Sequence, residues 1–299
     1  MSLSFNQMYV DVQDDLQDYD STALTYIKRK INIGQEILEA ELGSYYTEET
    51  LTRTSTANNG TYKMPVDAVK LTQAFVTVGT IKYDLEQVHD EDYWQYLKTT
   101  FFNQYSDAPT HIIVRRDTFE IFPALTTAGS VITLRYQAGN KFMQFDDYTD
   151  GTITTLANAD EDVTGSGTAW TAAMEGRYFK INADETWYKI YDVTAATTLV
   201  LNTTYQGASI AAGTETYTIG ELPRTPGATH YLPCVYAKWQ YFNGFKQDTD
   251  RTLVYKKEWI DGLAQAKTTY GKRYSSSYIP GRSSRLRGYN PNYPPHNLS

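Results

Sequence analysis

Apolar residues recur at helical spacing near both ends of the chain. Residues 5–16 place an apolar side chain at every third or fourth position, after Ser4, which can cap a helix. A longer stripe with the same period covers residues 22–42, and Gly43 follows it as a helix-ending glycine. We therefore predict two N-terminal helices, separated by a short polar break at residues 18–21.

The helical period returns after Pro223 and Pro226. Residues 232–242 carry one apolar face, and Asp-Thr-Asp at 248–250 supplies capping side chains for a helix that extends to Tyr270. These two helices cannot bury their apolar stripes alone, so the pattern favours packing against the long N-terminal helix. The expected product is a small bundle made from both ends of the chain.

Between these helices the apolar period shortens towards two. From Tyr45 to Asn140 the pattern predicts strands, with short strands within 69–78 before a turn at Gly79. Residues 90–97 instead predict a short helix, whose acidic residues lie at the end that the helix dipole favours. The other strands expected in this region are 81–85, 111–114, 118–122 and 131–136.

Residues 151–219 are rich in threonine, glycine and alanine. Two runs, 177–181 and 187–191, flank the polar turn 182–185 and predict a β-hairpin. Further strands are expected at 198–201 and 216–219. A segment of this size can fold as a small β-barrel or sandwich inserted into the first domain.

The fold class that follows is α+β. It combines a helical bundle from both chain ends, a β-rich middle, an inserted small all-β barrel or sandwich and an extended C-terminal tail. The predicted divisions are a first domain at 1–150, the β-module at 151–220, a helix pair at 221–270 that completes the first domain, and the tail at 271–299.

Composition excludes several classes of protein. The 299 residues are 41% hydrophobic and 21% charged, an ordinary balance for a folded chain. No apolar run approaches the ~20 residues of a membrane helix, and the first ten residues lack the pattern of a signal peptide. Cys234 is the single cysteine, so no disulfide framework is expected. The 26 tyrosines favour contact surfaces, although a β-rich core also collects tyrosine.

Charge divides the chain into an acidic body and a basic end. Residues 271–299 contain five basic and no acidic residues, whereas the whole chain has a formal charge of −8, so residues 1–270 carry −13. The end segment also holds tyrosine, isoleucine and leucine on a background rich in serine, proline and glycine. Such a segment suits ordering against a partner. Phosphate contact and base stacking would also fit it, but the acidic body disfavours nucleic acid.

Other clusters favour structural interpretations. The aspartates at 11–20 do not form an EF-hand loop, because Leu16 and Thr22 stand where glycine and glutamate are needed. The carboxylates at 146–147 and 160–162 could act as a glycosidase pair only at a separation that the sequence does not fix. Gly165–Thr168 lacks the phosphate-loop pattern and predicts a β-turn. His230 and Cys234 lie four apart on a predicted helix, where a buried cysteine is favoured over a nucleophile pair.

Several stretches resemble the head–tail adaptor, or connector, proteins of tailed bacteriophages. They are residues 20–43, Met-Pro-Val-Asp-Ala-Val-Lys at 64–70, the run from Asp107-Ala-Pro-Thr to Ile-Phe-Pro at 121–123, and the helix pair 232–270. The inserted segment, from Val-Thr-Gly-Ser-Gly-Thr-Ala-Trp at 163–170 to Tyr-Gln-Gly at 205–207, looks like a β-module that recurs in phage structural proteins.

The resemblance implies a non-enzymatic virion protein at the head–tail interface, assembled in the host cytoplasm. It implies a ring, commonly of twelve copies, that lies beneath the portal, connects the capsid to tail, nozzle or fibre proteins, and lets DNA pass without specific binding. No cofactor, metal or membrane contact is expected. The tail is the expected portal contact, through Tyr274, Tyr278, Ile279, Arg282, Arg285, Leu286, Arg287, Tyr289 and Tyr293.

An alternative is a receptor- or carbohydrate-binding protein associated with the tail or fibres. In this hypothesis Trp170, Trp187 and Tyr188 of the β-module would stack against sugar rings, although filling the core of the module is their favoured role. A third alternative, a hydrolase, would require an activity that depends on a single carboxylate.

Overall fold

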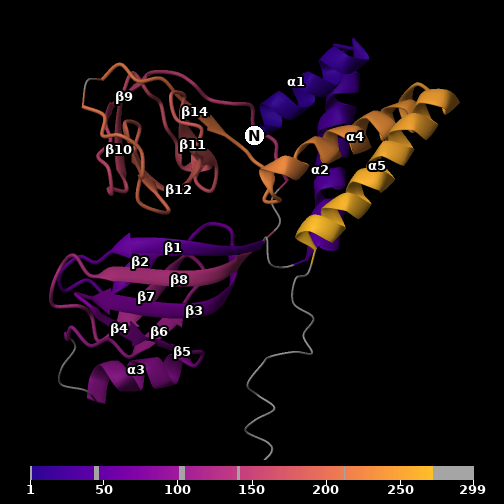
Figure 1. The fold of residues 1–299 in the computed structure, drawn as a ribbon. Helices are drawn as coiled ribbons and strands as arrows, with labels where there is room; N and C mark the ends of the chain where they lie inside the picture. Colours follow the sequence, from indigo (N-terminus) through magenta and orange to yellow (C-terminus); the bar gives the residue numbers. More distant parts are fainter. Residues whose placement is uncertain (1, 44–46, 101–104, 140–141, 212, 272–299) are drawn as a thin grey trace, which may run out of the picture.

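The computed structural model describes residues 2–43, 47–100, 105–139, 142–211 and 213–271. Within these residues the chain forms three bodies: a helical bundle from both chain ends, a sandwich of two β-sheets, and a third, curved β-sheet (Figure 1). The α+β architecture predicted from the sequence is confirmed. The predicted tail lies outside the described residues.

The bundle forms where the sequence predicted it. Its helices are α1 (Phe5–Leu16), α2 (Ser21–Leu42), α4 (Tyr231–Gln240) and α5 (Thr249–Tyr270), with the π-turn η4 (Tyr241–Phe245) between the last two. The Ser4 hydroxyl accepts the N–H of Gln7, whose side chain accepts the N–H of Ser4 at 3.0 Å. The side chains of Asp20 and Asp248 accept backbone N–H groups at the starts of α2 and α5.

Helix α4 joins the two ends of the chain. It packs against α1 and α2 from the N-terminal end and against α5. A close approach occurs at Gly34 of α2, where a β-carbon would lie 3.0 Å from the Cβ of Tyr236. Glycine at this position therefore lets the two backbones come together. Among the described helices, none is long and apolar enough to cross a membrane.

The middle of the chain forms a sandwich of two four-stranded sheets. The first sheet has the order β1 (Glu48–Thr54), β8 (Val131–Ala138), β3 (Ala68–Val78), β4 (Ile81–Asp84). The second has the order β2 (Thr61–Lys63), β7 (Thr118–Phe122), β6 (His111–Val114), β5 (Glu86–Val88). The prediction of short strands within 69–78 was wrong, because β3 is one strand of 11 residues. Two register shifts in its pairing with β8 interrupt the alternating pattern.

Helix α3 (Glu91–Thr100) covers the second sheet of the sandwich. Along β6 and β7, Ile112 and Ile121 face the sandwich core, whereas their neighbours Ile113 and Phe122 pack with Trp94 of α3. Because successive side chains point to opposite faces of a strand, β6 and β7 contribute to the sandwich core on one face and to the contact with α3 on the other.

The β-module is a six-stranded sheet that curls on itself (Figure 1). Its order is β14 (Tyr217–Gly220), β11 (Tyr178–Ile181), β12 (Tyr188–Ala195), β13 (Thr198–Leu201), β10 (Asp162–Ser166), β9 (Thr152–Thr155). A bridge between Ile153 and Glu215 links the last strand to the segment before the first, so the sheet approaches a closed barrel. The predicted hairpin is confirmed by the pairing of β11 with β12.

Short turns complete the described chain. The 3₁₀ turns are η2 (Ala172–Met174) and η3 (Gly227–Thr229). At the predicted turn 165–168, Gly165 and Ser166 end β10, and Gly167 has a φ of +68°, in the left-handed region that favours glycine.

Candidate functional site

The predicted portal-contact residues, Tyr274, Tyr278, Ile279, Arg282, Arg285, Leu286, Arg287, Tyr289 and Tyr293, lie outside the described residues. The description ends at Gly271, directly after α5. The surface of α5 is therefore the nearest described part of the predicted contact region.

Helix α5 has one buried and one exposed apolar face. Trp259, Gly262 and Ala266 are buried against the bundle. On the other side, Leu253, Val254 and Ile260 are 60%, 63% and 52% exposed. Since Leu253, Lys257 and Ile260 are spaced four and three apart, they share a helix face. Exposed apolar side chains grouped on one helix face make a candidate contact surface for another protein.

Acidic residues at the end of α1 and just after it form ion pairs with lysines from the C-terminal part of the bundle. Asp15 pairs with Lys238, and Asp18 pairs with Lys246 at 3.1 Å and accepts the Tyr241 hydroxyl. Burial and then the neighbouring aspartates raise the pKa of Asp11. Among the described residues, no group of three or more histidine, cysteine or acidic side chains could hold a metal ion.

The paired carboxylates at 146–147 fasten the β-module to the bundle. Asp146 lies 2.7 Å from Lys28 Nζ and accepts the Tyr9 hydroxyl at 2.6 Å, and these bonds lower its pKa. Asp147 accepts the Ser4 hydroxyl at 2.7 Å, and burial raises its pKa. At the other predicted pair, Glu161 forms an ion pair with Arg53 of the sandwich at 2.8 Å. These contacts give the carboxylates structural roles.

The Cys234 thiol and the His230 ring are not hydrogen-bonded to each other. The thiol faces the carbonyl oxygens of Met8 and His230, each at 3.7 Å, and burial raises its pKa to about 12. The imidazole nitrogens lie instead 3.1 Å from the N–H of Leu3 and 2.9 Å from the carbonyl of Thr225. The cysteine is buried, as the sequence favoured, and no nucleophile–base pair forms there.

Two of the three aromatic residues proposed for stacking on sugars lie in the core of the β-module. Trp170 is 3% exposed and donates its Nε1–H to the Tyr217 hydroxyl at 2.8 Å. Tyr188 is 6% exposed, and its ring centre lies 5.3 Å from that of Tyr205. Trp187 is half-buried with Lys180 Nζ 5.0 Å from its ring centre. The core-filling role is therefore confirmed for Trp170 and Tyr188.

Four charged side chains meet where the three bodies join. The Nζ of Lys189 (β12) lies 2.6 Å from Asp67, and the same carboxylate lies 2.5 Å from Arg224, which precedes α4. Arg224 and Lys189 also pair with Glu49 of β1. Burial alone would lower the pKa of Arg224, but the two carboxylates hold it above its usual value. The network balances two positive and two negative buried charges, and so fixes the bodies relative to one another.

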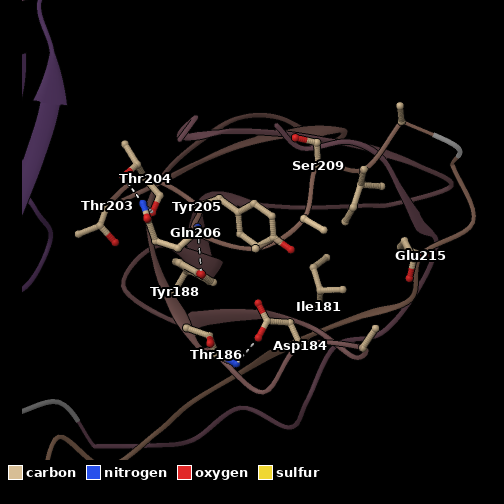
Figure 2. Close-up of a pocket in the computed structure, with 15 residues that line it drawn as sticks. Ile181, Asp184, Thr186, Tyr188, Thr203, Thr204, Tyr205, Gln206, Ser209 and Glu215 are labelled. Carbon is tan, nitrogen blue, oxygen red and sulfur yellow. Dashed lines mark hydrogen bonds between the residues drawn. The ribbon is translucent and has the colours of Figure 1, made fainter. Parts of the chain in front are cut away.

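A cleft that the sequence did not predict opens on the β-module (Figure 2). It has a volume of about 780 Å³ and lies between the turn 182–186 and the loop 203–211, with Glu215 also in its lining. We call it the module cleft. The sequence signals were the polar turn between β11 and β12 and the Tyr-Gln-Gly run at 205–207, but nothing in the sequence places these two segments opposite each other.

No family model matches the chain, and no curated protein matches it either.

Proposed function

We propose that the protein is a structural subunit of a tailed-phage virion, a head–tail adaptor that forms a ring beneath the portal. In this role it connects the capsid to tail, nozzle or fibre proteins, performs no catalysis and lets DNA pass through the ring. The first support for this function is the resemblance of the sequence to phage head–tail adaptor proteins. The observation that carries the proposal is the exposed apolar face in the first half of α5, the helix that ends where the basic tail begins.

The bundle suits assembly because its outer surface carries two patches of different chemistry, one apolar and basic and the other acidic. The face of α5 presents Leu253, Val254 and Ile260 beside Lys256 and Lys257. The end of α1 presents the exposed aspartates Asp11 and Asp14 beside the exposed Val10. Two different patches on one subunit support head-to-tail contacts between copies, and such contacts generate rings when the rotation closes.

The distribution of charge supports both docking and DNA passage. Residues 1–270 carry −13 and the last segment +5. An acidic ring repels DNA and so lets it slide through. A basic segment with aromatic residues can bind an acidic partner, and many copies acting together make weak individual contacts sufficient.

The proposal is tested by measuring mass in solution. Native mass spectrometry of the purified protein, alone and with the portal protein of the same phage, is expected to give a closed oligomer of the 34.0 kDa chain, by itself or on the portal. Deleting residues 272–299 is expected to leave the fold intact and to abolish portal binding. A chain that stays monomeric in both conditions would contradict the proposal.

The role of α5 is tested by a double substitution. Leu253→Glu with Ile260→Glu places two charges on the exposed face without touching the buried stripe, and we expect oligomers to dissociate. The matched control is Ile81→Glu on β4, which adds a charge at an equally exposed isoleucine of the sandwich. Oligomers that survive the double substitution as they survive the control would exclude this face from the ring contact.

A further inference from the structure

The module cleft combines the size and the side chains of a small-molecule site. Its volume of about 780 Å³ falls within the ~300–1,000 Å³ range of ligand pockets. Figure 2 shows the Tyr205 hydroxyl and the Asp184 carboxylate directed into the space between the two walls. Glu215 lies towards the opposite end from Thr203 and Thr204 in the same view. Polar groups thus converge on the cleft from both walls.

The polar groups are held in place by the protein. One oxygen of Asp184 accepts the N–H of Thr186 at 3.1 Å. The side chain of Gln206 donates to the Thr204 hydroxyl at 2.9 Å, and its backbone N–H donates to the Tyr188 hydroxyl at 3.1 Å. The ring of Tyr205 packs on Tyr188 and so closely against Gly207 that a β-carbon there would lie 2.2 Å from the Tyr205 hydroxyl oxygen. A site with fixed polar groups loses little entropy on binding.

The charge of the lining selects the class of ligand. Asp184 and Glu215 are the ionisable acids of the lining, and lysine, arginine and histidine are absent from it. Phosphorylated, sulfated or sialylated ligands would therefore meet repulsion rather than an ion pair. Carboxylates are strong acceptors for hydroxyl donors, and the second oxygen of Asp184 has no hydrogen-bond partner among the described residues.

The other residues that line the cleft provide both hydroxyl groups and apolar surface, a combination that suits a sugar ring. Hydroxyls come from Thr186, Thr203, Thr204 and Ser209. Apolar surface comes from Ile181, Ile210 and the alanines 183, 208 and 211. A saccharide presents hydroxyl groups at its edge and C–H groups on its faces, so it can use both kinds of surface at once.

We propose that the module cleft binds a neutral saccharide. Asp184 and Glu215 accept hydrogen bonds from sugar hydroxyls, and the aliphatic side chains contact the C–H faces. This binding is separate from the ring assembly, because the cleft uses no residue of the bundle. It also does not depend on Trp170, which lies in the core.

The experiment uses the full chain on an array of neutral, sialylated, sulfated and deacetylated amino-sugar oligosaccharides, followed by titration calorimetry with the best neutral binder. Asp184→Asn keeps an oxygen for the Thr186 N–H but removes the charge, and Glu215→Gln does the same at the other end. Each is expected to weaken binding about tenfold or more, because a hydrogen bond to a charged group is lost.

The matched controls are Asp162→Asn and Glu185→Gln, exposed carboxylates of the same module outside the lining. They are expected to bind as the unmodified chain does. Circular dichroism confirms that each variant is folded. The proposal is overturned if the array shows no saturable binding of a neutral saccharide, if only charged saccharides bind, or if the cleft variants bind as tightly as the controls.

Discussion

His230 ties the N-terminal end of the chain to the C-terminal helices. Its Nδ1 accepts the N–H of Leu3 at 3.1 Å, and its Nε2 donates to the carbonyl of Thr225 at 2.9 Å. Because Nδ1 can accept only when it carries no proton, this arrangement requires the neutral ring. The ring is 2% exposed, and burial lowers its pKa below the ordinary 6.5. Protonation therefore breaks a contact and charges a buried group.

The consequence is a loss of stability in acid. The unfolded chain takes up this proton near pH 6.5, before the folded chain does, so the His230 contribution is present above that pH and is lost as the pH falls below it. We expect His230→Gln to lower the thermal midpoint at pH 7.5 and to reduce its dependence on pH between 7.5 and 5. Circular dichroism melts measure both effects. His89→Gln, at an exposed histidine, is the control, and equal pH slopes for all three proteins would contradict the prediction.

Neighbours within one helix were predictable, but their partners were not. The four-residue spacing of His230 and Cys234 correctly predicted their proximity and the burial of the cysteine. The direction of the imidazole depends on Leu3, which is 227 positions away in the chain. Local spacing contains no information about such a contact.

The contact between α2 and α4 depends on the missing side chain at Gly34. A β-carbon there would lie 3.0 Å from the Cβ of Tyr236, an atom that cannot move without its backbone. We expect Gly34→Leu to separate the helices and to destabilise the bundle by about 1–3 kcal/mol, the usual range for overpacking. Ala40→Leu, at an exposed position of the same helix, is expected to change stability by less than about 0.5 kcal/mol. Urea unfolding followed by tryptophan fluorescence compares them, and equal stabilities would show that the helices accommodate the added atoms.

Helix ends and several strands followed from the sequence because their causes are local. The caps Ser4 and Asp248 were recognised from residue type and position, and strands β6, β7 and β13 match their predicted ranges. The pairing of strands was not predictable. Strand β1 pairs with β8, some 80 residues away, and β5 pairs with β6 in parallel. The module cleft was missed for the same reason, because it forms only when two distant loops face each other.

The three bodies follow a nested order along the chain. The bundle takes its helices from both ends of the chain, so the sandwich and the β-module lie between its N-terminal and C-terminal helices in the sequence. The β-module begins and ends at one place, where Tyr148 and Ile219 exchange backbone hydrogen bonds of 2.9 and 2.8 Å. Most of its buried residues form a cluster of their own, while Tyr191 and Val200 pack in the core of the sandwich. Adjacent ends and a largely separate core are the properties of a removable insert.

We therefore expect a chain in which residues 149–218 are replaced by a short glycine–serine linker to keep its bundle and sandwich. Lys189 is lost in this variant, but Arg224 still pairs with both Asp67 and Glu49, so the buried carboxylates keep a partner. Circular dichroism is expected to show the helices, and native mass spectrometry the same oligomer as the full chain, whereas saccharide binding disappears. Loss of the helical signal would mean that the module is required for folding. Saccharide binding that persists would place the proposed site outside the module, because the variant no longer contains the cleft.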